Sequence, residues 1–142
     1  MPVRKGSAQW SGDLWDGKGT LSTETGTLKD IAYDAKSRFE GGKTTNPEEI
    51  LGAAHAGCFS MALANSLSKA GFKVNSISTE DSVHIEKKPE GFRITRIDIS
   101  TVAEVEGIDN ETFQKHAAET KLGCPVSNAL QSVEMTLDAK LK

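Results

Sequence analysis

The sequence contains few cysteines, no basic cluster and no long apolar run. Two cysteines in 142 residues argue against a secreted scaffold that is held together by several disulfides. The 17 lysines and arginines are scattered among 20 acidic residues, so we expect no nucleic-acid partner. No apolar run reaches the length of about eighteen residues that a membrane span needs, so we expect no membrane partner. The N-terminus lacks the apolar stretch of a secretory signal, and we therefore expect a cytoplasmic protein.

The chain length fits a single domain. We expect residues 1–142 to form one domain, whose core is large enough to fold without a disulfide. The first forty residues are rich in glycine, serine and threonine, and they predict two or three short strands that end near Arg38-Phe39-Glu40. Trp10 and Trp15 in this region are predicted to pack in the core or at its rim.

A long helix is predicted to begin after Asn46. Asn46 can cap the helix, Pro47 suits its first turn, and Glu49 can close a capping box. The helical pattern continues to Ala70, and Gly71 supplies the stop. The predicted helix has about 24 residues and a length of roughly 36 Å, which is long for so small a domain.

Small residues dominate this predicted helix and leave little bulk on its surface. One stripe at helical spacing consists of Leu51, Ala54, Cys58, Met61 and Asn65. A long helix with small residues all round is typical of a helix that is buried on most sides. Because a chain this short can hardly cover such a helix, we predict that a second copy covers it in a homodimer.

The second half of the chain predicts a long hairpin. Apolar and polar residues alternate over residues 77–86 and again over residues 92–105. A turn at Pro89-Glu90-Gly91 joins these strands, and a bulge near Thr95-Arg96 would explain a change of phase in the second one.

Helices and a last strand are predicted after this hairpin. Asp109 is expected to cap a helix that ends near Lys121. A helical turn or two follows Cys124-Pro125, and residues 133–141 alternate as a closing strand. Strand clusters around helices indicate an α+β fold.

The two cysteines stand in unlike settings. Cys58 lies on the alanine-rich helix, where it can be a small apolar filler; as a nucleophile it would need a nearby positive charge, because only the thiolate attacks. Cys124, between Gly123 and Pro125, is placed at the cap of a short helix, where backbone N–H groups stabilise a thiolate and make it a good leaving group. The pair can be inert packing, a structural bridge or a redox couple, and a structural bridge is the least expected of these in a cytoplasmic protein.

Three charged or titratable residues are candidates to act on Cys58. The guanidinium of Arg38 can stabilise a thiolate, although a surface arginine on an edge strand is the alternative. Glu48 is a helix-capping carboxylate ten residues before Cys58, roughly 15 Å along a straight helix, so a shared site needs a broken helix or a partner chain. His55 can pair with Cys58 as a nucleophile or be a packed, hydrogen-bonded histidine. The dispersed cysteines and histidines match no metal site, and we expect no cofactor.

Several segments of this sequence closely resemble the OsmC/Ohr family, in its OsmC branch of osmotically inducible hydroperoxide peroxidases. The longest is residues 45–63, which contain Cys58, and residues 38–41 and 123–127 extend the likeness to Arg38 and Cys124. Residues 17–20 and 136–138 match as well, so the resemblance covers essentially the whole chain.

The resemblance implies a fold, an activity and a set of site residues. The fold would have antiparallel sheets packed around a long central helix, in an intertwined homodimer with two sites at the subunit interface. The activity would be that of a thiol-dependent peroxidase that reduces organic hydroperoxides to alcohols, and hydrogen peroxide less well. Cys58 would be the peroxidatic thiol and Cys124 the resolving one, with Arg38 and Glu48 beside the reactive sulfur.

The implied reaction passes through a sulfenic acid on Cys58 and a Cys58–Cys124 disulfide. A dithiol would reduce that disulfide, with lipoyl-bearing proteins as the implied donors. We expect Phe39, Leu51 and Met61 to form an apolar pocket for the peroxide. Two alternatives stay open: a small-molecule-binding or stress-interaction protein with idle thiols, and a peroxidase in which Cys124 is the attacking residue.

Overall fold

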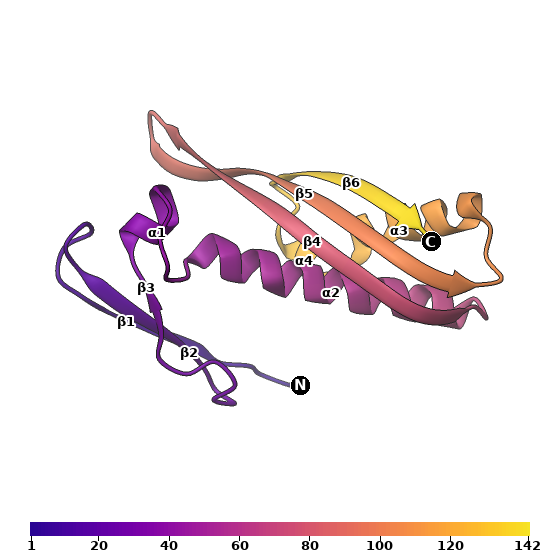
Figure 1. Cartoon of the computed structure of the whole chain (residues 1–142), viewed down its shortest axis with the longest axis horizontal. Coiled ribbons are helices and arrows are strands. Elements are labelled where there is room, and N and C mark those ends of the chain that lie inside the picture. The colour runs from indigo at the N-terminus through magenta and orange to yellow at the C-terminus, as the bar shows by residue number, and fades with distance from the viewer. The chain divides into compact units, whose positions relative to one another are not determined.

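The computed structural model describes residues 1–142 and divides them into two compact units. The N-terminal unit is Met1–Ile50 and the C-terminal unit is Leu51–Lys142. Figure 1 shows that each unit contains one small sheet, and that helix α2 (Pro47–Lys69) carries the chain from one unit into the other. The mixed helix and strand content confirms the predicted α+β class, whereas the single-domain organisation stays a prediction.

The N-terminal unit is an antiparallel meander followed by a short helix. Strands β1 (Gly6–Ser11), β2 (Lys18–Thr23) and β3 (Ile31–Tyr33) pair in this order. The prediction of a strand ending near Arg38 was wrong, because α1 (Ala35–Phe39) is helical there. The carboxylate of Asp34 accepts the backbone N–H of Ser37 at 2.8 Å and caps this helix, a local bond that favours helix over strand.

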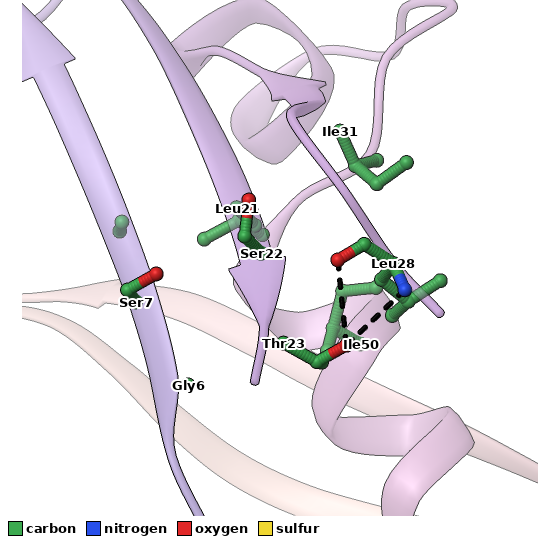
Figure 2. Close-up of a pocket in the computed structure, with 9 residues that line it drawn as sticks. Gly6, Ser7, Leu21, Ser22, Thr23, Leu28, Ile31 and Ile50 are labelled. Atoms are coloured by element: carbon green, nitrogen blue, oxygen red, sulfur yellow. Dashed lines mark hydrogen bonds between the residues drawn. The ribbon is translucent and has the colours of Figure 1, made fainter. Parts of the chain in front are cut away.

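The N-terminal unit has almost no buried core. Strand β1 is exposed along its whole length, and Ala35 is the only buried hydrophobic residue of the unit. One side of the sheet holds a largely apolar cavity of about 360 Å³, shown in Figure 2. Its lining residues are Gly6, Ser7, Ala8, Leu21, Ser22, Thr23, Leu28, Ile31 and Ile50.

Helix α2 begins and ends where the sequence predicts. The side chain of Asn46 accepts the backbone N–H of Glu49 at 2.8 Å, which is the predicted N-cap. The carboxylate of Glu49 instead accepts the hydroxyl of Thr45 at 2.9 Å. At the other end Gly71 has φ of 94° and the N–H of Phe72 reaches the carbonyl of Leu67 at 3.1 Å, a Schellman ending that favours glycine.

The buried stripe of α2 differs from the predicted one. Its buried positions from Gly52 onward are Gly52, His55, Phe59, Leu63 and Leu67. The bulky side chains bury more apolar area than the alanines, and burial of area decides which face turns inward.

The expected burial of α2 on most sides is not achieved by one chain. Met61, which belongs to the predicted stripe, is 77% exposed, and the small residues Ala53, Ala54 and Gly57 are exposed too. By length and composition α2 is apolar enough to cross a bilayer, although core helices of soluble proteins pass the same test. The face of α2 opposite the core is therefore exposed in the single chain.

The C-terminal unit is built on a long, bulged hairpin. Strand β4 (Lys73–Lys88) pairs with β5 (Gly91–Glu106) in antiparallel register. His84 lies opposite Arg96 and Ile85 opposite Ile94, so Thr95 is the extra residue of a bulge at the predicted place.

The remaining elements of this unit close the core. Helix α3 (Asn110–Gly123) is capped by Asp109, which accepts the N–H of Thr112 at 2.7 Å. Helix α4 (Pro125–Ala129) follows, and β6 (Glu134–Leu141) then pairs with β5 in parallel. This sheet is therefore mixed, where we expected antiparallel strands only, because the α3–α4 crossover is long enough to return the chain in the same direction. The core residues are Phe59, Leu63, Leu67, Ile97, Ile99, Ala103, Val105, Phe113 and Ala117.

Candidate active site

The two cysteines meet in the C-terminal unit. Cys58 lies on α2 and is half-buried, whereas Cys124 is fully buried at the junction of α3 and α4. Both are free thiols, and each thiol shifts the pKa of the other, so the two side chains are neighbours. Neighbouring thiols of this kind can form a disulfide once their sulfurs approach to bonding distance.

Cys124 is held in a polar setting within the core. Burial raises the pKa of the Cys124 thiol, but the hydroxyl and N–H of Ser127, the Cys58 thiol and the charge of His55 outweigh it, so that this pKa is lowered. The Sγ atom of Cys124 lies 3.1 Å from Oγ of Ser127 and accepts the N–H of Ser127 at 3.3 Å. Cys124 is therefore the thiol that ionises more readily in the reduced pair.

The pKa of the Cys58 thiol is shifted in the opposite direction. Burial raises the pKa of the Cys58 thiol, a hydrogen bond from the backbone of Val126 lowers it, and the neighbouring Cys124 raises it further. The net pKa is raised, and none of these influences is a cation. A Cys58 nucleophile therefore needs a positive charge that none of these groups supplies.

The N-terminal unit contains a prealigned guanidinium. Nε of Arg38 lies 3.0 and 3.1 Å from the two carboxylate oxygens of Glu48, and Nη2 lies 2.8 Å from one of them. The Glu48 side chain is only 7% exposed, whereas that of Arg38 is 36% exposed. This forked pair fixes the plane of the guanidinium and leaves Nη1 outside the pair.

A cavity lies beside this guanidinium. It measures about 260 Å³ and is lined by Trp10, Leu14, Tyr33, Asp34, Ala35 and Arg38. We expected an apolar pocket from Phe39, Leu51 and Met61. Phe39 belongs to the N-terminal unit and the other two to the C-terminal unit, so that pocket stays a prediction.

The structure brings the four predicted site residues together as two pairs, one in each unit. Arg38 and Glu48 form the first pair, and Cys58 and Cys124 the second. Their catalytic roles stay predictions.

A further group of polar residues is buried next to Cys124. Nδ1 of His55 is hydrogen bonded to Oδ2 of Asp81, and Nε2 lies 2.7 Å from Oγ of Ser127. The side chains of His55 and Asp81 are both 0% exposed. The prediction of a packed, hydrogen-bonded His55 is confirmed, and its hydrogen bonds go to Asp81 and Ser127 rather than to Cys58.

Asp81 and Ser127 were not recognised in the sequence. The signal for Asp81 was the alternation of β4, in which Thr79 and Val83 point inward with Asp81 between them. A carboxylate at an inward position needs a buried partner, and His55 was available. The hydrogen bond and charge of Asp81 raise the pKa of His55 against the opposing effect of burial.

Comparison with known proteins identifies the family. Residues 40–138 match the sequence profile of the family described as "OsmC-like protein". The protein named "Peroxiredoxin OsmC" from Escherichia coli (strain K12) is 50% identical over 139 residues, which cover 98% of this chain and 96% of that protein. The chain belongs to the OsmC family.

More distant relatives share the fold. The "Organic hydroperoxide resistance protein OhrB" from Bacillus subtilis is 26% identical over 124 residues, covering 86% of this chain and 89% of that one. A crystal structure of an organic hydroperoxide resistance protein from Elizabethkingia anophelis aligns with a TM-score of 0.77 at 21% identity, covering 99% of both chains. The second likeness confirms the fold alone.

Proposed function

We propose that the chain is a thiol-dependent peroxidase that reduces organic hydroperoxides to alcohols. The observation that carries this proposal is that Cys58 and Cys124 are neighbours and are both free thiols, with the polar side chains of Ser127 and His55 acting on Cys124. The 50% identity to a protein named Peroxiredoxin OsmC supports it. Idle thiols, as in a binding protein, would not need to be neighbours.

The reaction has two chemical steps and a reductive one. The Cys58 thiolate attacks the distal oxygen of the hydroperoxide, and the O–O bond breaks. The leaving alkoxide takes up the proton that Cys58 lost on ionisation and is released as the alcohol. Cys58 becomes a sulfenic acid, and Cys124 then displaces its hydroxyl group as water to form a disulfide. A dithiol restores both thiols by exchange, and we infer a lipoyl-bearing protein as its source in the cytoplasm.

Access favours Cys58 as the attacking residue. Cys58 is half-buried and can be reached by a peroxide, whereas Cys124 is 0% exposed. The lower pKa of Cys124 alone would favour the reverse order. Arg38 resolves this conflict in our proposal, because a guanidinium held by Glu48 would lower the pKa of Cys58 and orient the peroxide oxygen.

We infer that the active form is a homodimer. The exposed Met61 and the small residues beside it leave one face of α2 uncovered, and the N-terminal unit has an open apolar cavity and little core. A second copy would bury both. Because α2 is continuous from Pro47 to Lys69, the roughly 15 Å between Glu48 and Cys58 along a helix also favours a partner copy as the source of Arg38 and Glu48.

The cavity beside Arg38 supports a preference for organic peroxides. Trp10, Leu14 and Tyr33 present apolar surface next to the guanidinium, and this surface would favour an alkyl group over the hydrogen of hydrogen peroxide. A faster turnover of hydrogen peroxide than of an alkyl hydroperoxide, measured at matched concentrations, would contradict this part of the proposal.

A peroxide titration tests the activity itself. We expect the reduced chain to lose two thiols for each equivalent of an alkyl hydroperoxide, with one alcohol released. Cys58→Ser should abolish the loss. A binding protein with idle thiols would bind the compound without consuming thiols, and thiol loss that persists in Cys58→Ser would contradict the assignment of Cys58.

A further inference from the structure

An unbroken series of hydrogen bonds leads from Asp81 to the resolving thiol. Asp81 contacts Nδ1 of His55, Nε2 of His55 lies 2.7 Å from Oγ of Ser127, and that Oγ lies 3.1 Å from Sγ of Cys124. Three elements supply these residues: β4, α2 and the α3–α4 segment. The two intermediate residues, His55 and Ser127, are 0% and 3% exposed, so water does not compete for their bonds.

We propose that Asp81, His55 and Ser127 form a proton relay that takes the proton of Cys124 and so prepares this thiol to resolve the sulfenic acid on Cys58. The inference rests on the proposed peroxidase function and deepens it. Ser127 touches the reacting sulfur and is a catalytic residue, whereas His55 and Asp81 act through it and are positioning residues.

The same heavy-atom contacts fit two proton arrangements. In the first, the Cys124 thiol donates to Oγ of Ser127, and the Ser127 hydroxyl donates to Nε2 of a neutral His55. In the second, Nε2 of a protonated His55 donates to Oγ of Ser127, and the Ser127 hydroxyl donates to the Cys124 thiolate. The two arrangements differ by one proton, which moves from sulfur to imidazole through the hydroxyl without any change of partner.

Asp81 makes the protonated form of His55 favourable. Oδ2 of Asp81 is bonded to His55, but Oδ1 is buried and has no hydrogen-bond partner. A buried carboxylate with one free oxygen is costly unless a cation compensates it. The cation available to it is the imidazolium of His55, and the raised pKa of His55 is consistent with this pairing.

The charged groups around the relay are few. Those that act on His55 are Asp81 and Cys124, and those that act on Cys124 are His55 and Cys58. A change in the titration of Cys124 can therefore be traced to these side chains.

The connectivity is that of the Asp–His–Ser triads of hydrolases, but Ser127 is not placed as a nucleophile. Its Oγ has His55 on one side and Cys124 on the other, and the residue is 3% exposed. A substrate carbonyl cannot reach Ser127, so its hydroxyl acts on the sulfur of Cys124.

The relay accounts for the proton in the resolving step. The proton of Cys124 passes to Ser127 as the Ser127 proton passes to His55. The thiolate then attacks the sulfur of the Cys58 sulfenic acid, the S–S bond forms, and the S–O bond breaks. The released hydroxide and the proton held on His55 together make one water, so atoms and charge balance.

The test compares Ser127→Ala, Asp81→Asn and the double variant. Ser66→Ala is the matched control, because it removes a serine hydroxyl from another histidine, His116, at 2.6 Å. Two quantities are measured in the full chain. The first is the pH at which Cys124 becomes a thiolate, followed by ultraviolet absorbance in a Cys58→Ser background. The second is the rate of disulfide closure against the rate of sulfenic acid formation, by rapid mixing with an alkyl hydroperoxide.

The relay predicts that both single variants raise the titration pH of Cys124 toward the ordinary thiol value of about 8.5. Closure should slow by about ten-fold or more, whereas sulfenic acid formation and the Ser66→Ala control stay unchanged. Because the residues act as one unit, the double variant should be no slower than Ser127→Ala alone.

Two results would overturn the relay. The first is an Asp81→Asn protein in which Cys124 titrates as in the parent, and the second is a double variant whose effects add. If Asp81→Asn does not fold, His55→Gln is judged by the same criteria. A parent chain that consumes no peroxide would refute the peroxidase function instead, and the titration of Cys124 would still decide the relay.

Discussion

Arg38 holds Glu48 through two nitrogens, with N–O distances of 2.8, 3.0 and 3.1 Å. The Glu48 side chain is almost fully buried, although it lies in the first turn of α2, where carboxylates are usually solvated. The buried carboxylate of Glu48 therefore fixes the guanidinium of Arg38 in one orientation.

Glu48→Gln should therefore impair both catalysis and stability. A glutamine keeps the size of the side chain but loses the charge that aligns Arg38. We expect a fall in kcat/KM for an alkyl hydroperoxide of roughly ten- to hundred-fold and a loss of stability of about 1–3 kcal/mol. Glu106→Gln, in an exposed pair with Lys73, is the control and should change neither quantity by much. Unaltered turnover in Glu48→Gln would show that Arg38 and Glu48 do not belong to the active site.

Phe59 should be central to stability. It is 0% exposed and belongs to the stripe of α2 that packs into the core. We expect Phe59→Ala to lower the free energy of unfolding by about 3–5 kcal/mol, as measured by denaturant titration. A loss below about 1 kcal/mol would mean that the buried stripe of α2 is placed on the wrong face.

Met61 tests the homodimer. It lies two residues after Phe59 on the exposed side of α2, and the proposed partner would cover it. Met61→Glu should leave the fold of one chain intact and dissociate the dimer, because an unpaired carboxylate is costly in an interface. Sedimentation would show the change in mass. A parent chain that sediments as a monomer would contradict the proposed assembly.

Asp98 should stabilise the sheet in a pH-dependent way. The hydroxyl of Thr136 and the side chain of His84 lower the pKa of Asp98 from 3.8 to about 2, against the effect of burial and with help from Arg96. A depressed carboxyl pKa gives stability that is present above the ordinary value and is lost as the pH falls through the depressed one.

We therefore expect Asp98→Asn to be less stable than the parent at neutral pH, and the difference to shrink below about pH 4. Urea titrations at several pH values measure it. Asp138→Asn is the matched control, because Asp138 has only a 3.9 Å surface ion pair with Lys140. A difference for Asp98→Asn that does not depend on pH would contradict the assignment.

Local signals in the sequence predicted much of the fold. The cap at Asn46, the stop at Gly71, the bulge at Thr95 and the cap at Asp109 each depend on a few adjacent residues, and each is present. The strand expected near Arg38 failed for a local reason as well, since the capping bond of Asp34 was overlooked.

Contacts between distant segments were harder to predict. The parallel pairing of β6 with β5 depends on where a crossover returns, which alternation alone does not reveal. The buried stripe of α2 was misplaced because small residues on both faces fit the same spacing. Asp81 was missed because its partner, His55, comes from another element. The resemblance in residues 45–63 and 123–127 suggested roles for Cys58 and Cys124, but it did not show which buried residues contact Cys124.

The most direct test of the account is to find which sulfur a peroxide oxidises first. One equivalent of an alkyl hydroperoxide is added to Cys58→Ser and to Cys124→Ser in the presence of a sulfenic acid trap, and the labelled residue is located by mass spectrometry. We predict a label on Cys58 in Cys124→Ser and no label in Cys58→Ser. A label on Cys124 alone would contradict the assigned order of the two thiols.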